Sequence, residues 1–256
     1  LCAAGVTFMF LVSLNKHLRL INWFKEKNIQ EPNLIEYLDL VSLGTVCDVV
    51  PLIGLNRAIV KQGLKVLKSK KNLGLKTLID ICGINTQPNV YHMGYVLGPR
   101  INAGGRVGKS SHGANLLLNN NAKEVFKIAS ELDQFNKERQ YLEEDVLNKI
   151  AIEANKTQSD PVIILSGKNW HEGVIGIVAS RLKDKFNKPV IIITVDKNLG
   201  KASARSIIGF DIGSVTIAAM QEKILIKGGG HKMAGGFTID VNNIERFKEF
   251  VLKKFK

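Results

Sequence analysis

Lys201, Ser203 and Arg205 alternate with small residues in the string KASARS. In a β-strand, side chains two residues apart point to the same face, so this spacing would place all three side chains together. A hydroxyl group between two cations suits a phosphate group, whose oxygens accept hydrogen bonds from both kinds of donor. The string therefore predicts a strand with a phosphate-binding face.

A second candidate is the pair Arg100 and Arg106 in the glycine-rich string GPRINAGGRVG at 98–108. Glycine permits close approach of a backbone, and the planar arginine head group can fork onto phosphate oxygens. A structural turn with two solvated arginines is the alternative, and it stays open. One proline and four glycines predict a shaped loop or a broken element here, not an uninterrupted helix.

His171 and Glu172 stand directly before a predicted helix at 173–186, which carries Arg181 near its other end. The backbone amides at a helix N-terminus can help to hold an anion. His171 is therefore a candidate phosphate contact, and a capping role without any ligand is the alternative.

Three successive glycines precede His231 in the string KGGGHKMAGG at 227–236. Consecutive amides of Gly229, Gly230 and their neighbours could form an anion-binding nest with His231 at its edge. A glycine-rich loop alone proves little, so this candidate depends on the others.

Asp48 is a lone carboxylate in the apolar string LVSLGTVCDVVPL. Burial of an unpaired carboxylate is costly, so Asp48 is expected to be a helix cap, a salt-bridge partner or a metal ligand. The sequence contains no Walker A string, no GxSxG, no HExxH and no carboxylate cluster fit for two metals. A complete hydrolytic centre is therefore not expected from these residues alone.

The 256 residues carry 36 basic and 23 acidic side chains, a formal net charge of +13, which favours a polyanionic partner such as nucleic acid. Residues 156–256 hold 17 basic and 9 acidic side chains, a net charge of +8. The three cysteines form no CxxC pattern, which fits a reducing cytoplasm. The apolar run at 1–14 is too short to span a membrane and predicts a buried helix.

Helical spacing recurs at 33–43, in pieces within 55–82, and without any Gly or Pro at 122–154. After residue 160 the pattern changes to short apolar strands alternating with helices, which is typical of an α/β domain. Strands are predicted at 161–165, 189–195, 201–206 and 236–240, with helices at 173–186, 214–220 and 243–255. We expect a helical region, one long connecting helix, and a smaller α/β domain.

Five strings in this order resemble the RecJ exonucleases of the DHH phosphoesterase family: LVSLGTVCDVVPL, GPRINAGGRVG, WHEGVIGIVASRL, KASARS and GGGHKMAGGF. The resemblance implies the C-terminal part of a DHH domain at 1–120, a connecting helix at 121–156, and a DHH-associated substrate-binding domain at 157–256. It also implies degradation of single-stranded DNA from the 5′ end with Mn²⁺ or Mg²⁺, in recombination and repair.

Site residues follow from the same resemblance. Asp48 matches the aspartate of a family motif that ligates metal, and Arg100, Asn102 and Arg106 match a string that helps to close the active-site cleft. The residues that match phosphate-holding groups of the associated domain are Ser203, Arg205, His231 and the preceding Gly229 and Gly230, and the resemblance extends to His171 and Arg181.

The family's upstream aspartate motif and DHH triplet are not found in this sequence and are expected before Leu1. The chain by itself is therefore expected to be inactive or nearly so. A single-strand-binding protein and a helicase are partners implied by the resemblance. The alternatives are a noncatalytic nucleic-acid-binding remnant and a DHH phosphodiesterase of short oligonucleotides or cyclic dinucleotides.

Overall fold

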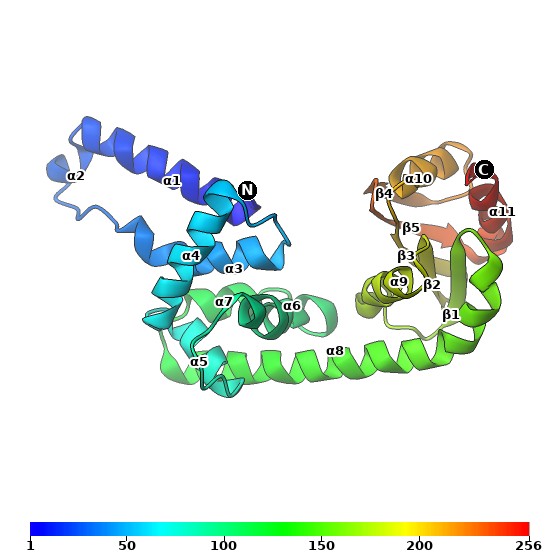
Figure 1. The fold of residues 1–256 in the computed structure, drawn as a ribbon, viewed down its shortest axis with the longest axis horizontal. Helices are drawn as coiled ribbons and strands as arrows, with labels where there is room; N and C mark the ends of the chain where they lie inside the picture. Colours follow the sequence, from blue (N-terminus) through cyan, green and yellow to red (C-terminus); the bar gives the residue numbers. More distant parts are fainter. Residues whose placement is uncertain (256) are drawn as a thin grey trace. The chain divides into compact units, whose positions relative to one another are not determined.

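The computed structural model describes residues 1–255. The chain forms two compact units, Leu1–Asn136 and Lys137–Lys256, and the boundary falls inside the long helix α8, Ala122–Lys156 (Figure 1). No helix in the described part is long and apolar enough to cross a membrane. Each unit has its own apolar core, so each is described by itself.

Unit 1 is helical. Its helices are α1 (Ala3–Leu20), α2 (Trp23–Glu26), α3 (Leu38–Cys47), α4 (Gly54–Lys68), α5 (Leu73–Ile81), α6 (Gly98–Val107), α7 (His112–Leu118) and the first part of α8. A 3₁₀ turn at Leu34–Tyr37 precedes α3, and a π-helical segment at His92–Leu97 precedes α6. The main core of this unit contains Leu78, Met93 and Leu97, and α8 adds Val125, Ala129 and Leu132 to it.

The prediction of a buried helix at 1–14 was wrong about burial. The helix exists as α1, and it packs on α3 where the Cβ of Ala4 lies 3.0 Å from the position a Cβ would take on Gly44. Its other side is exposed, with Val6 57% and Phe10 64% accessible. Hydrophobicity alone gave the wrong answer because nothing in the described residues covers that side.

The prediction of a loop or broken element at 98–108 was also wrong, because Gly98–Val107 is the helix α6. Pro99 lies in its first turn, where a missing amide proton costs little. A Cβ on Gly98 would lie 2.4 Å from Cys47 Sγ, and one on Gly104 would lie 2.7 Å from the carbonyl oxygen of Lys109. These glycines therefore serve close packing, and the three cysteines are free thiols.

The long helix predicted at 122–154 is confirmed as α8 (Figure 1). Asn121 caps its start, because its Oδ1 accepts hydrogen bonds from the amides of Lys123 and Glu124. The helix carries two separate apolar stripes at helical spacing. Val125, Ala129 and Leu132 pack in the core of unit 1, and Val146, Ile150 and Ala154 pack in a core of unit 2.

Unit 2 is the predicted α/β domain. Its sheet has the strand order β1-β2-β3-β5-β4, in which β1 (Ile163–Lys168) and β2 (Val190–Asp196) are parallel and the other pairs are antiparallel. The remaining strands are β3 (Leu199–Arg205), β4 (Lys227–His231) and β5 (Ala234–Asp240). The helix α9 (Glu172–Phe186) forms the crossover between β1 and β2.

Helices cover the two faces of this sheet unequally. The second part of α8 and α9 pack on one face, mainly over β1, β2 and β3. The helices α10 (Ile212–Gln221) and α11 (Ile244–Lys254) pack on the other face, where α10 lies against β4 and β5 (Figure 1). The α9 side of β4 and β5 is thus less covered than that of the other strands.

The glycine nest predicted at 228–230 is not formed. These glycines belong to the extended strand β4, and Lys232 and Met233 turn the chain into β5. Gly229 and Gly230 pair with Gly236 and Gly235, and a Cβ on Gly230 would lie 2.5 Å from the carbonyl oxygen of Ala234, so a larger residue would obstruct the pairing at that position. Gly229 and Gly230 stay candidate phosphate contacts, but only as exposed strand residues.

Candidate nucleic-acid interface

Strand register brings the predicted phosphate-binding residues of unit 2 onto one face. Arg205 pairs with Ala234, which pairs with His231, and Ser203 pairs with Gly236, which pairs with Gly229. Residues paired directly across antiparallel strands lie on the same side of a sheet. We call this surface the open sheet face; it comprises Lys201, Ser203, Arg205, Lys227, Gly229, His231, Ala234 and Gly236.

The open sheet face has small residues on its middle strand, between two strands with polar side chains. Ala234 and Gly236 of β5 separate β3 from β4, and a Cβ on Gly229 would meet nothing within 4 Å. The prediction that Lys201, Ser203 and Arg205 share one face of a strand is confirmed. The result is a shallow surface with cations on both sides, which suits a phosphate group.

Arg205 and Ser203 form a hydrogen-bonded pair. Arg205 Nη1 donates to Ser203 Oγ at 3.0 Å and to the carbonyl oxygen of Ala204 at 2.8 Å, so the guanidinium group lies over the strand. A Cβ on Gly176 of α9 would lie 3.0 Å from both Arg205 Nη2 and Ser203 Oγ. Gly176 therefore leaves the room that the pair occupies, a role that the sequence reading did not assign.

His231 stands at the exposed edge of the sheet. Its Nδ1 accepts a hydrogen bond from the amide of Met233 at 3.3 Å, so in the neutral ring the proton is on Nε2. A Cβ on Gly213 of α10 would lie 2.9 to 3.0 Å from the backbone of His231. Gly213 therefore allows α10 to support β4 from behind.

His171 caps α9. Its Nδ1 accepts a hydrogen bond from the amide of Gly173 at 3.1 Å, which is the capping role that the sequence left open. Next to it, Glu172 forms an ion pair with Lys201, and both side chains are more than half exposed. One of the cations of the open sheet face is thus partly neutralised.

Arg181 lies away from the open sheet face and pairs with Glu143 of α8. The side chain of Glu143 is 1% exposed and is also contacted by Arg139 at 3.2 Å. A buried carboxylate needs such partners, because an uncompensated buried charge is strongly destabilising. Arg181 therefore helps to attach α9 to α8, and no phosphate is needed to explain its position.

The three residues predicted from the string at 98–108 all lie on the helix α6. Arg100 Nε donates to Asp133 Oδ1 of α8 at 2.8 Å and Nη1 donates to the carbonyl oxygen of Val96 at 2.9 Å. Asn102 and Arg106 lie one helical turn apart on an exposed side of α6. Arg100 thus has an ion pair with α8, and the side chains of Asn102 and Arg106 are exposed.

Asp48 is the exposed C-cap residue of α3, with its backbone amide donating to the carbonyl oxygen of Gly44. The helix continues through Gly44, four residues beyond its predicted end. Across the described residues, no group of three or more His, Cys, Asp or Glu side chains could hold a metal ion. A divalent metal therefore does not fit these residues as a complete site, and Asp48 could supply one ligand at most.

Two buried polar residues of unit 1 were not assigned from the sequence, Asp39 in an apolar string and His112 among small and polar residues. Asp39 is 3% exposed, and burial raises the pKa of its carboxyl group although Oδ1 accepts a hydrogen bond from the amide of Leu40. His112 contacts Glu131 of α8 through Nε2 at 2.7 Å. Both are explained by packing.

Comparison with known proteins agrees with this arrangement. Residues 159–256 match the model of the DHHA1 domain. Over 97% of its length the chain is 38% identical to the single-stranded-DNA-specific exonuclease RecJ of Salmonella typhimurium, and 36% identical to that of Escherichia coli. It spans about half the length of these curated relatives, 45% in both cases.

Solved structures agree as well. The chain is similar to RecJ from Thermus thermophilus in complex with Mn²⁺, with a TM-score of 0.79 and 33% identity over 91% of this chain and 34% of that one. The same protein in complex with Mg²⁺ gives a TM-score of 0.78. Similarity along nearly the whole chain covers both the helical unit and the sheet unit, and the chain therefore belongs to the RecJ family.

Proposed function

We propose that this chain is part of a RecJ-type exonuclease that degrades single-stranded DNA from the 5′ end, in recombination and repair. Within that enzyme, its open sheet face holds phosphate groups of the strand. The single observation that carries this proposal is the register that aligns Arg205 and Ser203 with His231 and Gly229 across β5.

Charge supports the choice of a polyanion. The open sheet face has Lys201, Arg205 and Lys227 on two strands, within a region whose net charge is +8. Phosphate contacts by such side chains release counterions, so binding should weaken steeply with salt. His231 can donate a hydrogen bond to a phosphate oxygen from Nε2 of its neutral ring.

Hydrolysis needs groups beyond those described. Divalent cations such as Mn²⁺ or Mg²⁺ would neutralise charge at a scissile phosphate, and Asp48 is our candidate for one of their ligands. Because the described residues do not form a metal site, we propose that this chain alone binds a strand and is inactive or nearly so. That outcome would also match the noncatalytic alternative.

The proposal assigns roles to three regions. Residues 1–120 are part of a DHH phosphoesterase domain, in which Arg100, Asn102 and Arg106 help to close the active-site cleft. Residues 121–156 form the connecting helix, and residues 157–256 form the substrate-binding domain. The relatives' names mention single-stranded DNA and no further partner. A single-strand-binding protein and a helicase remain predicted partners, and the cytoplasm the predicted location.

The test compares fluorescence anisotropy of a 5′-phosphorylated single strand and an unphosphorylated one, with the whole chain. Arg205→Ala should weaken binding of the phosphorylated strand by roughly tenfold or more, since hydrogen bonds to charged groups contribute about 1.5–3 kcal/mol. The unphosphorylated strand should lose less. Equal loss for both strands would contradict a role of Arg205 in holding the terminal phosphate.

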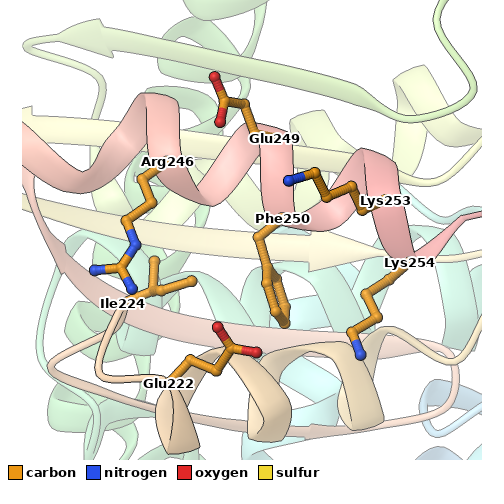
Figure 2. Close-up of a pocket in the computed structure, with 7 residues that line it drawn as sticks. All are labelled: Glu222, Ile224, Arg246, Glu249, Phe250, Lys253 and Lys254. Atoms are coloured by element: carbon orange, nitrogen blue, oxygen red, sulfur yellow. The ribbon is translucent and has the colours of Figure 1, made fainter.

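A matched control is Arg246→Ala. Arg246 lies on α11, which packs on the opposite face of the sheet, beside a hollow of about 510 Å³ that also holds Phe250 and Glu222 (Figure 2). Removing Arg246 lowers the net charge by the same amount, so any difference from Arg205→Ala reports position and not charge. Binding should change by less than about twofold.

A further inference from the structure

A pocket continues the open sheet face at the other end of β3. Its volume is about 750 Å³, and all of its lining residues belong to unit 2. It lies where β1 and β2 end, between the loop that leads into α9 and the turn that joins β2 to β3. The lining residues used below are Leu142, Asn169, Trp170, Val195, Asn198 and Leu199.

The walls of the pocket are apolar and rigidly held. Trp170 is 8% exposed, and its carbonyl oxygen accepts a hydrogen bond from Thr194 Oγ1 at 2.6 Å. Leu142 of α8 and Val195 of β2 add aliphatic surface. Leu199 is 48% exposed at the mouth, so its side chain is available to a ligand.

The rim of the pocket presents amide groups from two tight turns. Asn169 has a left-handed backbone with φ 61°, and Lys197 of the β2–β3 turn has φ 53°. These conformations are uncommon outside glycine, and they set the side chains of Asn169 and Asn198 beside an apolar wall. Amides can donate and accept, so they can pair with the edge of a planar polar ring.

The charged groups at the pocket largely cancel. Lys197 and Lys201 are opposed by Glu172 and Asp196, and Lys201 is already paired with Glu172. A phosphate group would gain little here. A flat group with apolar faces and hydrogen-bonding edges fits better, and a nucleobase has that chemistry.

The pocket also lies in line with the phosphate-holding residues. Leu199 and Lys201 are on the same side of β3 as Ser203 and Arg205, since all are spaced by two residues. Ser203 is four positions after Leu199 in β3, which is about 13 Å at the usual rise. A strand whose phosphate rests on Ser203 and Arg205 could therefore reach the pocket within a few nucleotides.

We propose that this pocket receives one nucleobase of the single strand whose phosphate is held by Ser203 and Arg205. The proposal rests on the proposed function and adds to it a second point of attachment. With this pocket the protein would contact the plane of a base as well as a phosphate. Because every base has apolar faces, the pocket would show no strong preference for sequence.

The experiment uses the whole chain and 5′-phosphorylated strands in which one nucleotide at a time is replaced by an abasic one. Loss of the captured base should weaken binding about tenfold at one position near the 5′ end, the usual scale for a base stacked on protein. Leu199→Ala should weaken binding of the intact strand. In that variant, abasic replacement should reduce the affinity only slightly further. Leu118→Ala, at a leucine 78% exposed in unit 1, is the matched control and should preserve the abasic effect.

Two results would overturn the proposal: abasic replacement with no effect at any position, or an equal effect in the wild-type chain and in Leu199→Ala. Asn198→Ala provides a second variant. The amide of Val241 donates a hydrogen bond to the backbone oxygen of Asn198, so the substitution removes the side-chain amide and keeps this bond. Failure of the proposed function looks different. In that case the wild-type chain does not favour the phosphorylated strand, and Arg205→Ala changes nothing.

Discussion

The open sheet face of unit 2 and the polar residues of α3 and α6 in unit 1 use similar side chains in different ways. On the sheet, Ser203, Arg205 and His231 come from β3 and β4, and register places them on one face with β5 between them. In unit 1, Arg100 pairs with Asp133, and Asp48 ends a helix alone. Thus the sheet gathers its polar side chains on one face, which we propose binds the strand, whereas in unit 1 Arg100 and Asp48 have contacts that serve the fold.

The largest expected effect is that of Arg100→Ala on stability. The side chains of Arg100 and Asp133 are 19% and 14% exposed, so removal of the arginine takes a cationic partner away from a mostly buried carboxylate. We expect a loss of about 3 kcal/mol in the free energy of unfolding, measured by denaturant titration. Arg205→Ala should cost far less stability. If the two losses were equal, the proposed contrast between the regions would not hold.

Gly213→Ala should have the next largest effect. A Cβ there meets the backbone of His231 at 2.9 Å, so α10 or β4 must shift, and overpacking of this kind costs about 1–3 kcal/mol. Gly229→Ala is the control, because its Cβ points into open space. It should leave the melting temperature unchanged but weaken strand binding. A stable Gly213→Ala chain would show that β4 is not supported by α10.

Asp39→Asn tests a buried polar residue of unit 1 through the pH dependence of the free energy of unfolding. Burial raises the pKa of the Asp39 carboxyl group in the folded chain, so the stability that it contributes is present below the unfolded pKa and is lost as pH rises through the folded value. At neutral pH the variant should therefore be more stable than the wild type. The advantage should disappear on acidification towards pH 4, as followed by thermal melting. A variant less stable at every pH would mean that the carboxylate is needed.

Glu172→Gln should have the smallest effect. It releases Lys201 from an exposed ion pair, whose contribution to stability is small, and leaves the lysine available to the strand. Affinity for single-stranded DNA should rise about two- to threefold at low salt, and the gain should vanish at high salt. Unchanged affinity at low salt would place Lys201 outside the interface.

The sequence predicted those features that depend on local pattern. The period of two in KASARS gave the face of β3, and an uninterrupted run of helix formers gave α8. The sequence-based predictions were wrong where glycine could indicate either a loop or close packing. The glycines of α6 serve packing against Cys47 and Lys109, and those of β4 serve strand pairing, although both were interpreted as loops.

Tertiary structure decided the rest. No local signal shows that β5 lies between β3 and β4, and only that order places His231 in line with Arg205. Likewise, the pairing of Arg100 with Asp133 joins positions 33 residues apart. The exposure of α1 could not be predicted, because an apolar string shows a tendency to be buried and not whether a partner surface is present.

The most direct test of the central claim is nuclear magnetic resonance of the whole chain titrated with a short 5′-phosphorylated single strand. The account predicts that amide shifts concentrate on Ser203, Arg205, Gly229 and His231 of the open sheet face. Shifts concentrated instead on α10 and α11, around Arg246, would contradict it.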